Sequence, residues 1–137
     1  MINIEKSIGF LLAKAYQRSC ALFNEEFASY DLTPQQFGLL AFLWNEDGLS
    51  QAELSARSQI DRTTIGGIID RLEKEGYIER RNHPEDRRAY QVFLTLKGKT
   101  LEEELSIVAH KTLARMNAPL TTKEQTTLIR ILEKIRR

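Results

Sequence analysis

The stretch N-H-P-E-D-R-R-A-Y, residues 82–90, gathers charged side chains between two segments that are rich in strand-forming residues. His83, Asp86, Arg87 and Arg88 are its polar, chemically active members. Cationic side chains on an exposed loop suit phosphate oxygens, because charge-assisted hydrogen bonds to phosphate are strong. A solvated loop with an idle ion pair is the alternative interpretation of these nine residues taken alone. Their place in the chain has to decide between the two.

A second group of polar residues lies on one face of a predicted helix over residues 62–75. Successive helical residues turn by about 100°, which places the aliphatic side chains together on one side: Ile65, Ile68, Ile69 and Leu72. Opposite them lie Thr63, Gly67, Asp70 and Lys74, flanked by Thr64, Gly66 and Arg71, and Arg62 is the first residue of the helix. Short side chains near the start of such a helix permit a close approach to base edges in DNA. This polar side is therefore a candidate DNA-binding surface.

The two arginines of this helix are its long hydrogen-bond donors. Arg62 and Arg71 suit a guanine edge, through paired hydrogen bonds, or a phosphate. The alternative for each is a salt bridge, because Asp70 and Glu75 are near in the sequence. An unpaired carboxylate would repel phosphates, so we expect Asp70 to orient an arginine or to accept a hydrogen bond from a cytosine amino group.

The small residues of the same helix also have two interpretations. Thr63 and Thr64 suit contacts with a phosphate or a thymine methyl group, but they also suit capping of the helix. Gly66 and Gly67 each cost the helix about 1 kcal/mol relative to alanine. A close approach of DNA explains that cost, and so does a close approach of another helix.

Capping residues mark the starts of the helices that position these groups. Thr33, Ser50, Asp61, Thr95 and Thr121 each precede a segment with helical apolar spacing, and their side chains suit unpaired backbone N–H groups. The predicted helices cover residues 5–29, 34–46, 51–58, 62–75, 96–116 and 122–136.

One region alternates with a period near two, as strands do, over residues 77–82 and 89–95. Gly76 ends the preceding helix, and Pro84 lies in the connection between the two strands. We predict a β-hairpin with an exposed charged tip. A helix–turn–helix followed by such a hairpin is the outline of a winged helix, so the predicted fold class is mainly α with a small β-hairpin wing (α+β).

The composition excludes several classes of protein. A chain of 137 residues with 42% hydrophobic and 28% charged residues suits one domain with its own core. No apolar run approaches the ~20 residues of a membrane span, and a signal peptide is not expected, so we predict a cytoplasmic protein with no membrane partner. Two separated histidines and one cysteine predict no metal site, no cofactor and no enzyme. Because the net charge is only +1, any DNA binding depends on where the charges lie.

Residues 49–98 resemble the winged-helix region of the MarR family of bacterial transcription regulators. The shared features are a short helix with a central leucine, a helix ending in D-R-L-E-K-E-G-Y-I-E-R, a wing with D-R-R, and a strand that closes in L-T. The segment D-L-T-P-Q-Q-F-G-L-L-A-F-L is similar to the family's second helix. The resemblance implies a single domain over residues 1–137, with a winged-helix lobe at about 33–95 and dimerisation helices at about 1–30 and 96–137.

The resemblance also implies a homodimeric, DNA-binding transcriptional repressor. Its recognition helices would enter the major grooves of a pseudo-palindromic double-stranded operator, and its wings the adjacent minor grooves. Arg88 would enter the minor groove, and Asp86 would hold the wing tip by pairing with an arginine. Arg87 would contact a phosphate, and His83 would add a weaker contact. A winged-helix protein-interaction module without sequence-specific DNA binding is the alternative function.

The long first and last helices match the family's dimerisation helices. The predicted dimer interface consists of Ile8, Leu11, Leu12, Leu128, Ile131, Leu132 and Ile135. From the residues alone, packing within one chain is the alternative for the apolar stripe on residues 122–136.

The family frequently responds to a small phenolic or aromatic acid, which implies an effector pocket between the dimerisation helices and the DNA-binding lobe. A cation beside aromatic rings suits an aromatic carboxylate. The candidate lining residues are Lys14, Tyr16, Gln17, Arg18, Tyr30, Phe37 and His110. Each of them also has a plainer interpretation as a core or solvated residue.

Cys20 is predicted to be a buried structural thiol. Some members of the family sense peroxide through a cysteine near the start of the first helix, just before a segment similar to F-L-L. Here Gly9 stands at that place, and Cys20 follows about three helical turns later. The sequence therefore does not predict a peroxide sensor.

Overall fold

The computed structural model describes residues 1–86 and 89–137 and contains two compact units. One unit, which we call the helical unit, consists of residues 1–29 and 107–137. The other, which we call the winged unit, consists of residues 30–106. None of the described helices combines the length and the apolar character that a membrane crossing requires.

The order of elements agrees with the order predicted from the sequence. The helical elements are η1 (Ile4–Lys6), α1 (Ile8–Glu26), η2 (Ala28–Tyr30), α2 (Pro34–Asn45), α3 (Gln51–Ser58), α4 (Arg62–Lys74), α5 (Leu96–Asn117) and α6 (Thr122–Ile135). The strands are β1 (Leu49–Ser50), β2 (Ile78–Asn82) and β3 (Tyr90–Leu94). The predicted helix over residues 5–29 is too long, because the 3-10 turns η1 and η2 replace its ends and Ser7 caps α1.

Helices begin at the capping residues that the sequence predicts. Thr33, Ser50, Asp61 and Thr121 each accept a hydrogen bond from the backbone N–H three residues later. At Thr33, Ser50 and Thr121 the third residue's side chain also accepts from the cap N–H, which completes a capping box. The hydroxyl of Thr95 accepts from the N–H of α5's third residue at 3.2 Å.

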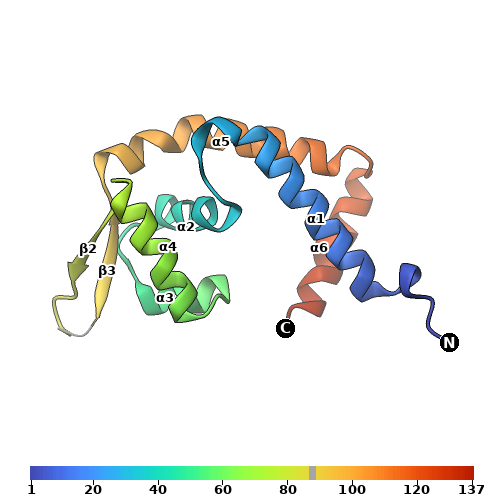
Figure 1. Ribbon diagram of the computed structural model, residues 1–137, viewed down its shortest axis with the longest axis horizontal. Helices are drawn as coiled ribbons and strands as arrows, with labels where there is room; N and C mark the ends of the chain where they lie inside the picture. Colours follow the sequence, from blue (N-terminus) through green and yellow to red (C-terminus); the bar gives the residue numbers. More distant parts are fainter. Residues whose placement is uncertain (87–88) are drawn as a thin grey trace. The chain divides into compact units, whose positions relative to one another are not determined.

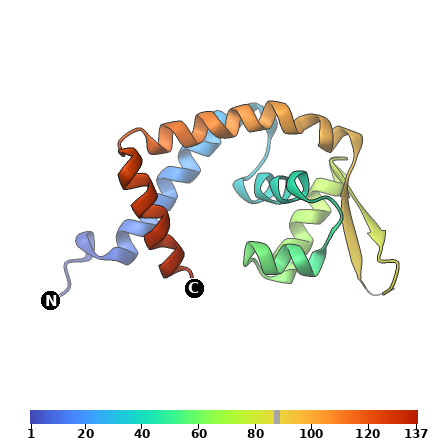
Figure 2. The same cartoon turned by 180° about the vertical axis from the view of Figure 1, so that it is seen from behind.

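The wing has one more strand than the predicted hairpin. β2 and β3 pair antiparallel over their whole length, and β1 adds a third strand on the other side of β3, with Leu49 opposite Val92. Asp47, just before β1, fixes this edge because its Oδ1 accepts from the N–H groups of Gly48 at 3.1 Å and Leu94 at 2.8 Å. The strands β2 and β3 lie side by side, and the end of β3 leads into the start of α5 (Figure 2).

The winged unit has a core of its own. The sheet packs against α2, α3 and α4, which lie on the same side of the hairpin in Figure 1. The most deeply buried side chains come from every element of the unit: Leu39, Leu40, Leu43, Leu49, Leu54, Ile65, Ile69, Leu72, Ile78, Val92 and Leu105. Removal of this apolar surface from water is the main favourable term in its folding.

The start of α5 lies against the sheet because Gly98 has no side chain. A Cβ atom at this position would clash with the carbonyl oxygen of Tyr77. That oxygen accepts the Thr95 N–H at 3.0 Å, while Trp44 donates its indole N–H to the carbonyl of Gly98 at 3.0 Å. These contacts anchor α5 to the winged unit.

The helical unit has a small core, centred on the end of α1. Phe23 and Phe27 are buried, and their rings stack with centroids 4.0 Å apart. Glu26 contacts Lys111 at 3.3 Å and Arg115 at 3.0 Å, which joins α1 to α5. Burial by itself would raise the pKa of Glu26, but the hydrogen bonds from these two cations outweigh it and lower the pKa.

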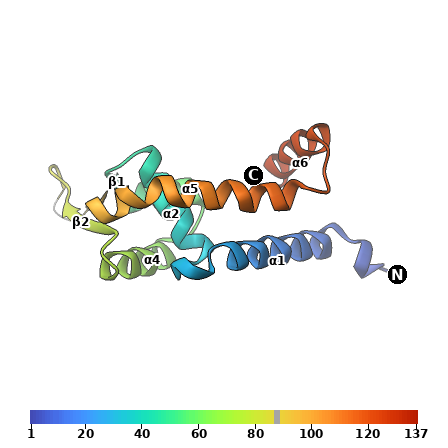
Figure 3. The ribbon, with the colours of Figure 1, turned by 90° about the horizontal axis from the view of Figure 1, so that it is seen from above.

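The apolar side chains of α1 and α6 find little cover in this chain. Exposed fractions between 37% and 69% are found at Ile8, Leu11, Leu128, Ile131, Leu132 and Ile135, whereas Leu12 is half-buried. Within the helical unit, α1 and α6 lie on opposite sides of the end of α5 (Figure 3). The α6 stripe is therefore not buried by packing within the described chain, which was one of its two interpretations.

Candidate nucleic-acid interface

A tight turn between α3 and α4 forms the helix–turn–helix. Gln59, just after α3, has a left-handed backbone with φ of 58°, which is uncommon for a residue other than glycine. The Ser55 hydroxyl donates to the Ile60 carbonyl at 2.5 Å, and the Ile60 N–H donates to the Ser58 hydroxyl at 3.2 Å. The side-chain hydroxyls of α3 thus hold the turn that directs the chain into α4.

Helix α4 separates its apolar and polar faces as predicted. Ile65, Ile68, Ile69 and Leu72 are all buried. The candidate DNA-binding residues are exposed, apart from the half-buried Gly66: Arg62, Thr63, Thr64, Gly67, Asp70, Arg71 and Lys74. One helix therefore packs on the core with one face and leaves its polar face in solvent.

The arginines of α4 remain available for a partner. Neither Arg62 nor Arg71 forms an ion pair with a residue that the structure describes. The alternative interpretation was that Arg62 and Arg71 form salt bridges with Asp70 and Glu75. Among the described residues, neither arginine forms such a salt bridge. Two exposed guanidinium groups, Arg62 at the start of α4 and Arg71 in its last turn, are the strongest hydrogen-bond donors of this helix.

The capping interpretation holds for Thr64. Its N–H donates to Asp61 Oδ1 and its hydroxyl to Asp61 Oδ2, both at 2.9 Å. The hydrogen bonds from Thr64 lower the pKa of Asp61, because they favour the charged carboxylate. Thr63 is exposed beside this cap.

The adjacent glycines have different surroundings. A Cβ atom at Gly66 would lie 3.2 Å from Nε2 of Gln51, so this glycine permits the close packing of α3 on α4. A Cβ atom at Gly67 would meet no atom within 4 Å. Helix packing therefore explains Gly66, but within the described residues nothing explains Gly67.

Arg80 on β2 is an important residue that sequence reasoning missed. Its side chain is only 21% exposed and contacts Asp70 at 2.6 Å and Glu73 at 3.0 Å. It also donates to the carbonyl of Gly66 at 3.3 Å, and its own N–H donates to Glu73 at 2.9 Å. Asp70 therefore pairs with an arginine, in line with one of its two expected roles, and that arginine comes from the wing.

The described part of the wing tip is held by its backbone. The Ala89 N–H donates to the carbonyl of Asp86 at 3.1 Å, and the His83 N–H donates to the carbonyl of Ala89 at 3.0 Å. The ring of His83 is half-buried, and its Nδ1 accepts the N–H of Glu85 at 3.1 Å. Arg87 and Arg88 lie outside the described residues.

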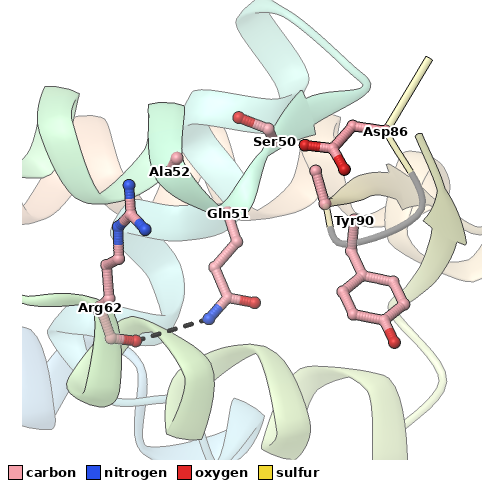
Figure 4. A pocket seen from close by; sticks show the side chains of 7 residues that line it. Ser50, Gln51, Ala52, Arg62, Asp86 and Tyr90 are labelled. Carbon is pink, nitrogen blue, oxygen red and sulfur yellow. Dashed lines mark hydrogen bonds between the residues drawn. The ribbon is translucent and has the colours of Figure 1, made fainter. Parts of the chain in front are cut away.

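An open groove of about 480 Å³ lies between the wing and the starts of α3 and α4 (Figure 4). It is lined by Ser50, Gln51, Ala52, Arg62, Asp86, Ala89 and Tyr90. The Gln51 amide reaches across to the Arg62 carbonyl at 3.5 Å, and Tyr90 is 45% exposed at the other side. The sequence did not predict Gln51 and Tyr90 as site residues, because only the folded chain brings them beside α4.

The candidate effector residues of the helical unit lie mostly in solvent. The Lys14 ammonium donates to Gln17 at 3.3 Å and lies 5.3 Å from the ring of Phe10. Arg18 lines an open pocket of about 320 Å³ with residues of α1, of the end of α5 and of the connection between α5 and α6. His110 is exposed on α5.

The candidate effector residues of the winged unit have structural partners. The Tyr30 hydroxyl donates to Glu104 at 2.5 Å, and this hydrogen bond raises the pKa of the tyrosine. Phe37 packs edge-to-face against Trp44, with ring centroids 5.8 Å apart. Both residues therefore support the fold of the winged unit, whatever else they contact.

Cys20 is not the buried thiol that the sequence predicts. It is half-buried on α1, one turn after the exposed Tyr16. A hydrogen bond between these two side chains raises the pKa of the Tyr16 hydroxyl. The expectation of burial is wrong because the helical unit covers α1 only near its end.

Comparison with known proteins points to one family. The model of the MarR family matches residues 32–90. The HTH-type transcriptional repressor NicR of Pseudomonas putida is 32% identical over 133 residues, which make up 97% of this chain and 84% of NicR.

Solved structures resemble the whole chain. The structure of Bordetella bronchiseptica BpsR, described as regulated in its DNA binding by 6-hydroxynicotinic acid, has a TM-score of 0.94 at 29% identity and covers 99% of this chain and 97% of that one. A mutant of Escherichia coli MarR complexed with operator DNA has a TM-score of 0.89 at 27% identity and covers 98% and 99% of the two chains.

Proposed function

The chain belongs to the MarR family of transcriptional regulators, and we propose that it is a homodimeric repressor that binds a pseudo-palindromic DNA operator. The observation that carries the proposal is the exposed polar face of α4 beside the open groove (Figure 4). Arg62 and Arg71 are exposed there without an ion pair to a described residue, so they are free to bond phosphates or guanine edges. The operator complex of the E. coli MarR mutant supports this use of the fold.

The wing completes the proposed contact surface. Arg80 joins β2 to α4 through four polar contacts, so the wing and the recognition helix act as one body. We assign Arg87 to a phosphate and Arg88 to the minor groove, where narrow A·T tracts attract arginine. His83 and Asp86 shape the described part of the wing tip.

The proposed homodimer rests on the apolar faces of α1 and α6. Exposed aliphatic side chains gather on these helices of the helical unit, from Ile8 near one end of the chain to Ile135 near the other. Exposed apolar side chains gathered in this way mark a protein–protein interface. A two-fold axis would bring a second copy of the same surface to cover it and would set two α4 helices on one face of the DNA.

The test is a titration of the protein with DNA fragments from around its own gene, at two salt concentrations. Specific binding to one fragment should weaken by about 1,000-fold or more between roughly 50 and 200 mM salt if six or more phosphates are contacted. Arg71→Ala should cost about 1–3 kcal/mol of operator binding and relax discrimination. Arg130→Ala, on the exposed polar side of α6, is the control and should bind as the native protein does. Equal, weak binding to every fragment would support the interaction-module alternative instead.

We also propose that a small aromatic acid releases the DNA. The naming of 6-hydroxynicotinic acid for BpsR supports this class of ligand, and α1 presents the exposed cations Lys14 and Arg18. Arg18 lines a pocket whose other walls are mainly apolar, including Leu22, Met116 and Leu120, so a carboxylate and a ring find complementary groups there.

The effector test uses 6-hydroxynicotinate and benzoate as probes, with benzamide as the uncharged control. Either acid should release the operator fragment at a concentration at which benzamide does not. Arg18→Ala should raise the required concentration of acid, whereas Lys111→Ala, on α5, should leave it unchanged. Release by benzamide at the same concentration would contradict the role of the carboxylate.

Regulation, and not catalysis, is the activity that we assign, because the relative NicR is named as a repressor. For the same reason we place the protein in the cytoplasm, where bacterial operators are found. Both assignments depend on the result of the operator-binding test.

A further inference from the structure

The polar face of α4 contains a carboxylate at its centre. Asp70 lies on the same side of the helix as Thr63 and Gly67, at the spacing i, i+4 and i+7. Its side chain is 68% exposed, so it belongs to the surface that the proposed function turns toward DNA. A carboxylate near phosphates is unfavourable unless its charge is compensated.

Arg80 provides that compensation and fixes the carboxylate. Its Nη2 contacts Asp70 Oδ1 at 2.6 Å and donates to the carbonyl of Gly66 at 3.3 Å. Its Nη1 contacts Glu73 at 3.0 Å, so the guanidinium is held from three directions. Asp70 therefore presents an oriented carboxylate to solvent, and its Oδ2 has no hydrogen-bond donor among the described residues.

The fold does not need Asp70 in order to hold Arg80. Glu73 already bonds both the backbone N–H of Arg80, at 2.9 Å, and its guanidinium, at 3.0 Å. Ion pairs with a partner as exposed as Asp70 contribute little to stability. A second carboxylate on the exposed side is better explained by something outside the chain.

Gly67 leaves room for that external group. It precedes Asp70 by three residues, next to it on the helix surface, and a Cβ atom there would meet no atom within 4 Å. An interior helical glycine costs about 1 kcal/mol relative to alanine, and no packing within the described residues offsets this cost. The bare backbone beside Asp70 allows a base edge to come within reach of a short aspartate side chain.

We propose that Asp70 reads a base: its carboxylate accepts a hydrogen bond from the exocyclic N4 amino group of a cytosine in the major groove. The inference rests on the proposed binding of operator DNA and adds the residue that selects one C·G pair. Arg80 acts as the positioning residue that fixes the carboxylate and neutralises its charge.

The first test is Asp70→Asn in the full chain, with the operator fragment and an unrelated fragment of equal length. Loss of the negative charge should strengthen binding to the unrelated fragment, whereas the preference for the operator should fall by about tenfold or more. In a set of operators with single base-pair changes, the variant should lose its dependence on one C·G pair and keep it elsewhere. If Asp70 had only a structural role, Asp70→Asn would weaken binding to both fragments by the same factor.

Glu73→Gln is the matched control, because it alters the other carboxylate on the same guanidinium. Thermal unfolding should show a stability loss at least as large as that of Asp70→Asn, while operator preference stays as in the native protein. Asp70→Glu keeps the charge but moves the carboxylate by one methylene, so it should also lose the dependence on the C·G pair. If the Asp70→Asn protein does not fold, Asp70→Glu still tests the inference.

The outcomes separate the inference from the proposed function. If the native chain binds no fragment specifically, the operator proposal fails and the inference fails with it. If the native chain discriminates and both Asp70 variants keep the dependence on every C·G pair, only the inference is overturned.

Discussion

Helices α4 and α6 carry the same kind of apolar stripe, but the two stripes lie in different surroundings. In α4, Ile69 and Leu72 are completely buried against the sheet and the neighbouring helices. In α6, Leu132 is 37% exposed and Ile135 49% exposed. Each helix begins with a capping residue and has four aliphatic side chains on one side, so the sequence treats them alike.

The difference shows that an amphipathic pattern states which face needs cover, but not which molecule supplies it. For α4 the cover is the rest of the winged unit, and the open face is polar. For α6 the residues that the structure describes supply little cover, and the open face is apolar. Apolar surface contributes roughly 25 cal/mol per Å² when it leaves water, so the α6 stripe favours association.

Among these substitutions, Leu132→Glu should have the largest effect, which is on the association of two chains. If the α6 stripe is covered by a second copy, the substitution places a charge in that interface. An uncompensated buried charge costs about 3–5 kcal/mol, so the dissociation constant of the dimer should rise by at least about 100-fold. Sedimentation analysis over a range of protein concentrations measures the change.

Arg130→Glu is the control for this substitution, because it introduces the same side chain on the opposite side of α6. It should leave the dimer intact. A chain that stays dimeric with Glu at position 132 would show that the α6 stripe is not the interface.

Leu72→Ala tests the other half of the comparison. This side chain is fully buried within the winged unit, so its truncation should cost about 2–5 kcal/mol of unfolding free energy. Chemical denaturation measures the loss, and the dimer dissociation constant should be unchanged. A dissociation constant that rises together with the loss of stability would mean that the two stripes are not independent.

Gly67→Ala should have the smallest effect on stability, and in the opposite direction. Alanine is favoured over glycine in a helix by about 1 kcal/mol, and its Cβ would meet no described atom, so the melting temperature should rise. Operator binding should weaken, because the new methyl group occupies the open face of α4. A Cβ atom at Gly38, in α2, would also meet no described atom within 4 Å, so Gly38→Ala should raise stability without affecting DNA binding. Equal DNA binding by both variants would count against a close approach at Gly67.

Local features were predictable from the sequence, whereas features that join distant segments were not. The caps at Thr33, Ser50, Asp61 and Thr121 occur as predicted because a cap bonds within three residues of itself. β1 was missed because a strand of 2 residues has no periodicity of its own and exists only through its pairing with β3. In the same way Arg80 appears as one of several strand charges until the fold places it on Asp70 and Glu73.

The surface of α4 was predicted correctly, but the reasons for its residues were only partly visible. Gly66 and Gly67 are indistinguishable in the sequence, and only the position of Gln51 on α3 shows that they differ. Cys20 was expected inside the protein because thiols are commonly buried. The structure leaves it half-buried on α1 instead.

The short strand β1 limits how this wing can be engineered. A two-stranded hairpin is marginally stable by itself, and here Asp47 and Leu49 anchor β3 from its outer edge. A chimera that transplants only residues 77–95 onto another regulator would leave this support behind. A graft should therefore also include the segment from Asp47 to Ser50. The unit to exchange then consists of two separate segments of the sequence that lie together in one folded sheet.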